Sequence, residues 1–402
     1  MRKLTILAAL ATAVAVATAA TLASASTRAH STTRAAAAMA TAKVTCGSKR
    51  TLGFMAPFTG PAASVGQQQV RWVKYWVKTY NKTHKKKIKT QNEDTMLGAP
   101  NGTAEALKGA QALSSSSKVM GVVGPAGSNE IVAVTKTLKK GGLAWVSGSS
   151  TRTSLTTDGT RTGFMFRTVP PDKIQGATVA KYISKTLKLK RVFIIDDEET
   201  YSTGLANTVQ SKLRAAGVKV KRAGISQSDS NFASVIATIP GNNQLVYIPW
   251  QLTGQAIPFL DQLKQAGKGS MRVMGSDGLF DPSFASEAKK TGIRVYDSFF
   301  PLNPKSSIIA AYKKAHHGHG DYFGAPSYAA AQVVTTAISK ACAKGHGKTT
   351  RAQVRKMIAK TRIAAGKSVL GVPLRFNHNG DLSTLHKFGI YRAKGGQFVP
   401  IA

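Results

Sequence analysis

The chain has 402 residues, of which 42% are hydrophobic and 18% charged, so it can bury two globular cores and is not a disordered chain. Two cysteines are too few for a disulfide scaffold or a thiolate zinc cluster. The formal net charge of +38 comes mostly from scattered basic residues without zinc-finger spacing or an RNA-binding motif. It therefore favours an anionic cell envelope over nucleic acid as the neighbour of this protein.

The N-terminus has the pattern of an export signal. Basic residues precede an apolar run from residue 4 to about residue 25, which ends in a small-residue "ASA" cleavage site. We predict a signal peptide over 1–25, a flexible linker over 26–47, and an exported protein in the periplasm or on the outer face of the cell envelope. An uncleaved membrane anchor is the alternative, because the apolar run is long. In an exported protein Cys46 and Cys342 could form a disulfide or remain two free thiols, and the sequence leaves both open.

Short apolar runs then alternate with helical periods along most of the chain. The first series of predicted strands and helices covers 51–58, 66–82, 101–113, 119–125, 128–140 and 143–146. The second series covers 173–187, 191–196, 203–217, 218–225, 231–239, 244–250, 253–267 and 271–278. Repeated βα units predict two α/β domains, each a mostly parallel sheet flanked by helices. The helical segments 307–316 and 327–342 and the C-terminal tail are expected to complete these two domains.

Small polar residues gather where the predicted strands end. The strand-end loops read "GPAGSN", "VSGSST", "DDEETYSTG", "IPWQLTG" and "GSDGLFD". Parallel sheets bind ligands at these carboxyl ends, where the loops lead into helix N-termini. Loops of glycine, serine and threonine with free backbone N–H groups predict a site for an anion such as a carboxylate.

The order of several motifs is more specific than any one of them. In chain order they are "GFMAPFTGPAASVGQQ", "GVVGPAGS", "VSGSSTRTSLT", "FRTVPPDKIQGATVAKY", "TYSTGLA", "NFASVIATI", "VMGSDGLFD" and "LRFNHNGDL". This ordered set resembles the extracytoplasmic substrate-binding proteins of ABC transporters in the branched-chain amino acid (Leu/Ile/Val-binding) family. The resemblance runs from about residue 50 to the end of the chain.

The resemblance implies the type I periplasmic-binding-protein fold, in which two lobes trap a ligand and are joined by three hinge crossovers. The implied crossovers lie near 168–171, 298–302 and 374–377. The implied lobes are 48–168 plus 301–374 for lobe one, and 171–297 plus 377–402 for lobe two.

The resemblance also implies which residues bind the ligand. Ser128 and Thr151 are expected to bind a carboxylate, and the Ser149 carbonyl to accept from an ammonium group. Tyr201 is expected to reach across from lobe two, and Asp277 to receive the ammonium. The further expected ligand-binding residues are Val65, Ser150, Trp250, Gln251 and Gly278. Val65, Trp250 and Gln251 stand where the family has other residues, which puts leucine itself in doubt as the ligand.

Each of these residues also has a simpler interpretation. Ser128 and Thr151 could be helix caps, Asp277 a turn former, Tyr201 a surface residue and Trp250 a core residue. The acidic run 196–199 could bind a cation, but a solvated loop in a basic protein is the simpler interpretation.

We therefore expect a receptor that captures an amino acid or a related small carboxylate by hinge closure and delivers it to an ABC permease. We expect a monomer without cofactor or metal, and no enzyme, because no G-x-S-x-G elbow or helical zinc-binding histidine pair is present. The alternatives are a receptor for an aromatic acid or an amide, a ligand-sensing ectodomain of the same fold, and a basic envelope-adhering protein without a small ligand.

Overall fold

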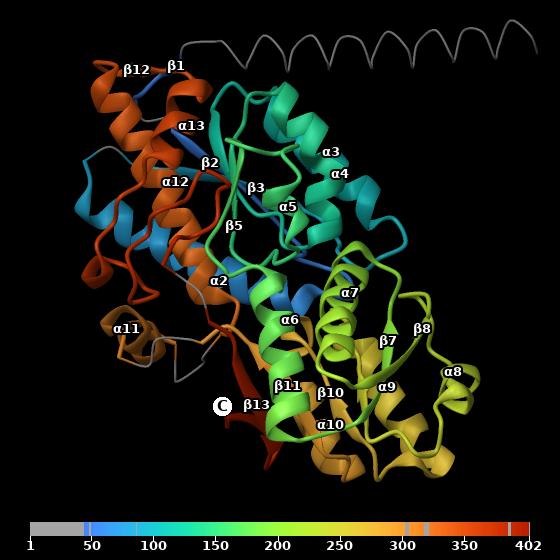
Figure 1. Cartoon of the computed structure of the whole chain (residues 1–402). Helices are drawn as coiled ribbons and strands as arrows, with labels where there is room; N and C mark the ends of the chain where they lie inside the picture. Colours follow the sequence, from blue (N-terminus) through green and yellow to red (C-terminus); the bar gives the residue numbers. More distant parts are fainter. Residues whose placement is uncertain are drawn as a thin grey trace, which may run out of the picture.

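The computed structural model describes residues 44–47, 50–85, 87–301, 305–316, 321–384 and 387–401 (Figure 1). The predicted signal peptide and most of the predicted linker lie outside these residues. Among the described helices, none combines the length and the apolar character that a membrane crossing demands.

The first sheet is entirely parallel and forms the centre of the first lobe. Its strands, in spatial order, are β3 (Lys89–Asp94), β2 (Thr51–Ala56), β4 (Val119–Val123), β5 (Trp145–Ser147) and β6 (Met165–Arg167). The helices of this lobe are α2 (Ala63–Thr83), α3 (Gly102–Ser115), α4 (Ser128–Lys140), α5 (Ser154–Thr157), α11 (Ser307–Ala315), α12 (Gly324–Lys344) and α13 (Arg351–Ala359), with a short 3₁₀ turn at Ala365–Lys367.

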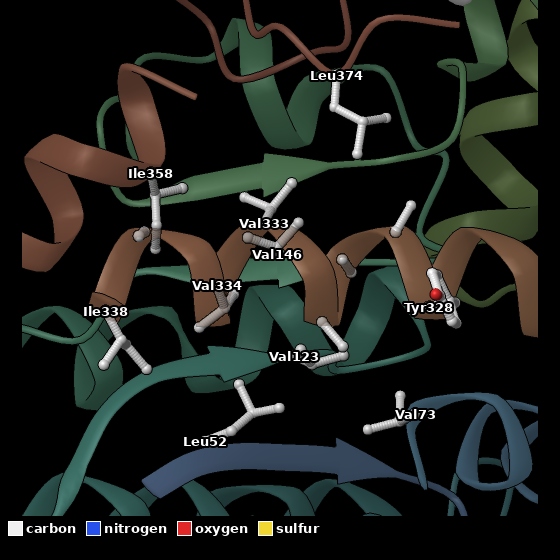
Figure 2. Packing of buried hydrophobic residues seen from close by; sticks show 14 of the residues in the cluster. Leu52, Val73, Val123, Val146, Tyr328, Val333, Val334, Ile338, Ile358 and Leu374 are labelled. Carbon is white, nitrogen blue, oxygen red and sulfur yellow. The ribbon is translucent and has the colours of Figure 1, made fainter. Parts of the chain in front are cut away.

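Alternation along β2 explains why helices cover both faces of this sheet. Leu52 and Phe54 lie in a buried cluster with residues of α2, α12 and α13, whereas Met55 lies in a second cluster with residues of α3 and α4. Figure 2 shows Val334 and Ile338 of α12 packed beside the strands in the first of these clusters. The helices after residue 306 thus complete the first lobe, as the sequence analysis expected.

The second sheet is mixed and forms the centre of the second lobe. Its strands, in spatial order, are β8 (Lys219–Gly224), β7 (Arg191–Asp196), β9 (Leu245–Tyr247), β10 (Arg272–Met274), β11 (Val295–Phe299), β13 (Gly389–Lys394) and β14 (Gln397–Pro400). Strand β13 pairs antiparallel with both of its neighbours, and all other pairs are parallel. Its helices are α6 (Asp172–Lys181), α7 (Thr200–Ala215), α8 (Ala233–Thr238), α9 (Thr253–Leu263) and α10 (Pro282–Thr291). Helical turns also follow α6 at Tyr182–Thr186, α9 at Lys264–Lys268, and β10 at Asp277–Leu279.

Strands β3 and β6 are absent from the sequence prediction. Strand β3 reads "KTQNED" and lies at the edge of its sheet, so it needs no apolar face and shows no hydrophobic alternation. Strand β6 has three residues, which is too short for a periodic pattern. Both strands are defined by pairing with a neighbour and not by their own composition.

The chain passes between the two lobes three times. It leaves β6 for α6 through 168–171, leaves β11 for α11, and returns from the segment after Leu374 to β13. Arg167 pairs with Asp381 in an isolated parallel bridge, and its backbone N–H donates to the Gly380 carbonyl at 3.0 Å. The first and third crossovers therefore run side by side. The exact lobe boundaries stay a prediction, and Leu302 of the second expected crossover lies outside the described residues.

A disulfide joins Cys46 to Cys342 across 296 residues of sequence. Strands β1 (Val44–Thr45) and β12 (Lys348–Thr349) pair antiparallel close to it. The structure therefore contains the disulfide, which is one of the two states that the sequence left open. It fastens the beginning of the described chain to the end of α12 in the first lobe.

The candidate ligand site between the two lobes

The loop that follows β5 is held together by its own hydroxyl groups. Ser147 donates its hydroxyl to the Pro125 carbonyl at 2.7 Å, and its oxygen accepts from the backbone N–H of Ser150 at 3.1 Å. Ser149 and Ser150 each donate to the Ala126 carbonyl at 2.8 Å. These bonds join the loop after β5, which we call the hydroxyl loop, to the loop after β4. Several serines in succession are therefore needed to build the hydroxyl loop itself.

Ser128 is the first residue of α4 and lies beside this loop. Its hydroxyl oxygen accepts from the backbone N–H of Arg152 at 3.3 Å, while the first N–H groups of α4 stand at a helix N-terminus. A helix N-terminus attracts anions because its first N–H groups lack intrahelical partners. We call Ser128, Ser149 and Ser150 the hydroxyl wall of the cleft.

Facing them, the second lobe contributes an acid and a tyrosine. Tyr201 of α7 donates its hydroxyl to Asp277 Oδ1 at 2.6 Å and lies 2.9 Å from Ser276 Oγ. Asp277 follows β10, and burial raises the pKa of its carboxyl group to about 6, although the hydrogen bond from Tyr201 opposes the rise. A Cβ atom on Gly278 would lie 2.6 Å from the Gln251 Cα, so glycine is required for this close approach. We call Tyr201, Gln251, Asp277 and Gly278 the acid wall.

The two walls meet in one cavity of about 40 Å³, which we call the small cavity. Its lining residues come from both lobes: Ala62, Val65, Leu97, Ala126, Gly127, Ser128, Ser149, Ser150, Tyr201, Gln251, Asp277, Gly278 and Phe323. Most of the residues expected from the sequence therefore converge on a single interlobe space.

Trp250 does not line this cavity, and its expected ligand contact is corrected here. Its fully buried ring packs 5.7 Å from Phe232 and 5.2 Å from Phe259, centroid to centroid, in the core of the second lobe. Its indole N–H donates to the Ile195 carbonyl at 2.7 Å, which satisfies the one polar atom of the side chain. The core interpretation of Trp250 is the one that the structure shows.

Thr151 is also outside the lining of the small cavity. It is fully buried, and its carbonyl accepts from the backbone N–H of Asp172 at 2.8 Å. Its hydroxyl is a polar neighbour of the Asp172 carboxyl group but makes no hydrogen bond of ordinary geometry with the described residues. Thr151 therefore joins the hydroxyl loop to α6, and its contact with a ligand stays a prediction.

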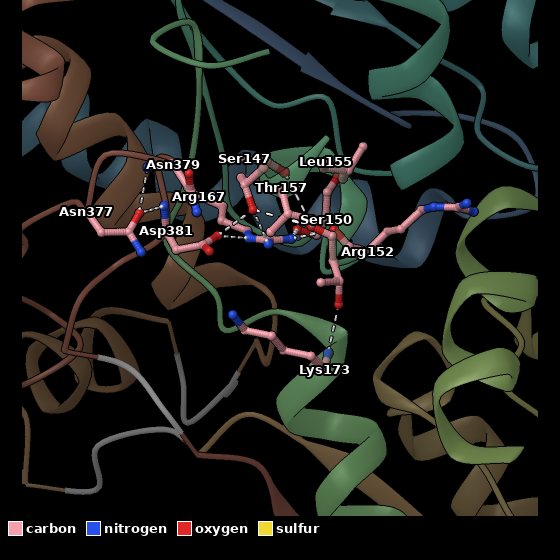
Figure 3. A network of polar contacts seen from close by, with 12 residues as sticks. Ser147, Ser150, Arg152, Leu155, Thr157, Arg167, Lys173, Asn377, Asn379 and Asp381 are labelled. Atoms are coloured by element: carbon pink, nitrogen blue, oxygen red, sulfur yellow. Dashed lines mark hydrogen bonds and ion pairs between the residues drawn. The ribbon is translucent and has the colours of Figure 1, made fainter. Parts of the chain in front are cut away.

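An arginine at the end of β6, directly before the first crossover, anchors the same loop (Figure 3). Arg167 is fully buried and forms an ion pair with Asp381 of the third crossover at 2.6 Å. It also donates to the Arg152 carbonyl at 2.8 Å and to the Thr156 hydroxyl at 2.7 Å. The backbone N–H of Lys173 in α6 donates to the Thr153 hydroxyl at 2.9 Å. The hydroxyl loop is thus tied to two crossovers at once.

Two buried acids near the acid wall were missed by the sequence analysis. Asp172 and Asp297 are 1% and 0% exposed, and neither carboxyl group forms a hydrogen bond of ordinary geometry with the described residues. Burial and then repulsion from Asp277 raise the pKa of Asp172 to about 8, and the same two causes raise the pKa of Asp297 well above its usual value. An acid inside the apolar run "VYDSFF" was the available signal for Asp297.

No group of three or more acidic, histidine or cysteine side chains suited to a metal ion occurs in the described part of the chain. The cleft therefore offers hydroxyl groups, helix N–H groups and carboxyl groups, which can hold a dipolar molecule between them. Such a two-lobed α/β molecule with a polar interlobe cavity has the architecture of a solute-binding protein.

Comparisons with known proteins agree with this class. The family model described as "Periplasmic binding protein" matches residues 49–397, and the chain belongs to that family. It is 28% identical over 361 residues to the Leu/Ile/Val-binding protein BraC3 of Rhizobium johnstonii, covering 87% of this chain and 93% of that protein. It is 25% identical to the Leu/Ile/Val-binding protein homolog 3 of Brucella melitensis, covering 87% and 92% of the two chains.

Solved structures show the same fold. The leucine-binding protein LivK of Thermotoga maritima has a TM-score of 0.78 at 22% identity, covering 88% of this chain and 98% of that one. The branched-chain amino acid transporter substrate-binding protein LivJ of Streptococcus pneumoniae, in complex with isoleucine, has a TM-score of 0.73 at 21% identity, covering 88% and 99%. A solute-binding protein of Rhodopseudomonas palustris, in complex with benzoate, has a TM-score of 0.73 at 19% identity, covering 88% and 95%.

Proposed function

We propose that this protein is the extracytoplasmic solute receptor of an ABC importer and that it captures an amino acid or a related small carboxylate in the interlobe cleft. The observation that carries the proposal is the small cavity, since Ser128 and Ser149 line it from one lobe and Tyr201 and Asp277 from the other. The names of the relatives, which are amino acid-binding proteins, support this ligand class. We propose no catalytic role, cofactor or nucleic-acid partner.

The two walls suit the two ends of a zwitterion. The helix N-terminus at Ser128 offers N–H groups to a carboxylate, and Asp277 offers a negative charge to an ammonium group. A zwitterion loses its hydration in a closed cleft, so both of its ends need partners there. Each charge-assisted hydrogen bond contributes about 1.5–3 kcal/mol in such a site.

Binding is proposed to proceed by hinge closure. The hydroxyl wall binds the ligand first, and the acid wall gains its contacts only when the lobes approach. Contacts between the lobes already exist here: Asn129 donates to Glu199 at 3.1 Å, and Arg152 donates to the Thr200 carbonyl. A ligand shifts the population toward the closed form by its greater affinity for that form.

A receptor for an aromatic acid is the second candidate. Phe323 lines the small cavity together with Val65 and Leu97, so an apolar ring has a place to pack. The benzoate-bound neighbour shows that this fold accommodates such a ligand. An aromatic acid has no ammonium group, and therefore the carboxylate of Asp277 separates the two candidates.

A thermal-shift panel of amino acids, aromatic acids and amides tests the proposal. A ligand at a hundred times its Kd is expected to stabilise the protein by about 2.7 kcal/mol. For an amino acid, Asp277→Asn is expected to lower the affinity tenfold or more, about 1.4 kcal/mol. Asp261→Asn, a half-exposed acid in α9, is the matched control. If no small molecule raises the melting temperature, the receptor proposal is wrong. If only aromatic acids or amides do, and Asp277→Asn has no effect on them, the second candidate replaces the first.

A further inference from the structure

A second and larger cavity opens beside the small cavity. It has a volume of about 400 Å³, and Leu97 lines both cavities. We call it the acidic cavity, because four carboxyl groups line it, from Glu130, Asp197, Glu198 and Glu199. Glu130 belongs to α4 of the first lobe, whereas the other three belong to the loop between β7 and α7 of the second. The acidic cavity is therefore also a space between the lobes.

The four acids have no cationic partner among the residues that the structure describes. In the described part of the chain none of them takes part in an ion pair. Their hydrogen bonds come from neutral groups: the amide of Asn129 donates to Glu199, and the amide of Gln227 donates to Asp197 at 3.0 Å. This is unexpected in a chain with 56 basic and only 18 acidic residues. Four like charges around one space repel an anion and attract a cation.

Two residues that line this cavity, Glu130 and Asn129, each have a buried acceptor atom without a donor among the described residues. Glu130 is 3% exposed; its Oε2 accepts from the Gly127 N–H at 2.6 Å, but its Oε1 makes no hydrogen bond of ordinary geometry with the described residues. Thr95 is a polar neighbour of this carboxyl group, but the geometry of that contact is not that of a hydrogen bond. Asn129 also lines the cavity, and its buried Oδ1 atom accepts no hydrogen bond from the described part of the chain. A cationic ligand group brings N–H donors and positive charge together.

Burial also favours the protonated form of the two most enclosed acids, Glu130 and Asp197. The pKa of Glu130 is raised to about 7 and that of Asp197 to about 6, and desolvation is the largest cause for both. Near neutral pH, Glu130 therefore binds a proton part of the time. A cation in the acidic cavity would replace this proton as the source of compensating charge.

We propose that the acidic cavity receives a cationic group of the ligand whose amino acid end lies in the small cavity. The preferred ligand class is then a basic amino acid such as lysine or arginine. This inference rests on the proposed function, because it needs the amino acid end to be bound at Ser128 and Asp277. The small cavity has room for only a few waters, so a long side chain must extend beyond it. Leu97 gives the apolar stem of such a side chain a surface between the two cavities.

The decisive comparison is L-lysine against L-norleucine, which has the same carbon chain without the terminal ammonium group. Titration calorimetry on the full-length exported protein at low ionic strength is expected to give an affinity for lysine or arginine at least about tenfold higher than for norleucine. The double variant Glu198→Gln/Glu199→Gln keeps hydrogen-bond acceptors of the same shape and removes two charges. It is expected to bring the lysine-to-norleucine affinity ratio close to one, whereas the control Asp261→Asn keeps the ratio of the original protein.

The outcomes separate this inference from the proposed function. If norleucine or leucine binds as tightly as lysine and arginine, or if the double variant keeps the original ratio, the acidic cavity does not select a cation, and the receptor proposal still stands. If no amino acid binds at all, the proposed function fails, and the inference that rests on it fails too. A ratio that falls in the double variant but not in the control supports the inference.

Discussion

The serines of the loop after β5 donate to backbone carbonyls of their own lobe, whereas the carboxyl groups of Asp172 and Asp297 behind the acid wall accept no hydrogen bond of ordinary geometry from the described residues. Ser147, Ser149 and Ser150 each donate to a carbonyl of the β4 loop, at 2.7 to 2.8 Å. Asp172 and Asp297 are buried without bonds of that kind in the described residues. The first wall is therefore built before a ligand arrives, while the second has charge that closure on a ligand can compensate.

This difference gives each wall a distinct role in recognition. A preorganised wall loses little conformational entropy on binding, so it suits the first encounter with a ligand. A wall with raised carboxyl pKa values binds protons that a cationic ligand group can displace, so it suits the discrimination of charge. Substitutions next to each wall test the two halves of this comparison.

The largest effect is expected where the hydroxyl loop is anchored. Arg167→Met leaves Asp381 buried without its cation and removes the donors to the Arg152 carbonyl and the Thr156 hydroxyl. Breaking a buried ion pair on one side costs about 3–5 kcal/mol of unfolding free energy. Urea denaturation measures the loss. The control Lys108→Met removes an exposed pair with Glu105 and is expected to change stability by less than about 1 kcal/mol. Equal effects of the two variants would mean that the loop is not preorganised by Arg167.

A smaller loss is expected inside the hydroxyl loop itself. Ser147→Ala leaves the buried Ser150 N–H without its acceptor and leaves the Pro125 carbonyl with only the longer bond of 3.4 Å from the Ser150 hydroxyl. Each unsatisfied buried group costs about 1–3 kcal/mol, so stability falls by an amount in this range, and ligand affinity falls with it. Urea denaturation and calorimetry measure the two quantities, with the exposed Ser230→Ala, outside both cavities, as the control. Unchanged stability and affinity would contradict a wall held together by hydroxyl groups.

The buried acid Asp172, behind the acid wall, is expected to make the stability of the protein depend on pH. The folded pKa of Asp172, about 8, is raised above the ordinary value of 3.8, so folding takes up a proton between these pH values. Stability therefore decreases as pH rises from 4 to 8, by at most about 1.4 kcal/mol per pH unit for this group. Asp172→Asn removes this contribution and flattens the dependence.

Unfolding free energies of the original protein and of Asp172→Asn, measured between pH 5 and pH 8, check this expectation. The exposed Asp229→Asn is the control and is expected to leave the slope unchanged. A steeper slope in Asp172→Asn than in the original protein would show that the buried acid is not the group that titrates.

Much of the fold followed from local sequence patterns. Alternating strand and helix periods predicted two parallel α/β series, because burial on both faces of a sheet leaves short apolar runs between amphipathic helices. Strand β3 escaped the prediction because an edge strand can be polar. The position of the interlobe cavity could also be predicted in large part from the sequence. Small polar residues at strand ends mark the edge of a parallel sheet where loops converge.

What the sequence by itself determined is the alternation of elements, the hydroxyl-rich loop and the acid at Asp277, because these depend on neighbours in the chain. Only the tertiary structure decided that Trp250 packs in the core, that Cys46 bonds to Cys342, and that Glu130 lines one cavity together with residues 197–199. These relations join residues far apart in sequence. The packing of the two lobes determines the direction of each side chain, its burial and which like charges lie near one another. No local sequence pattern contains that information.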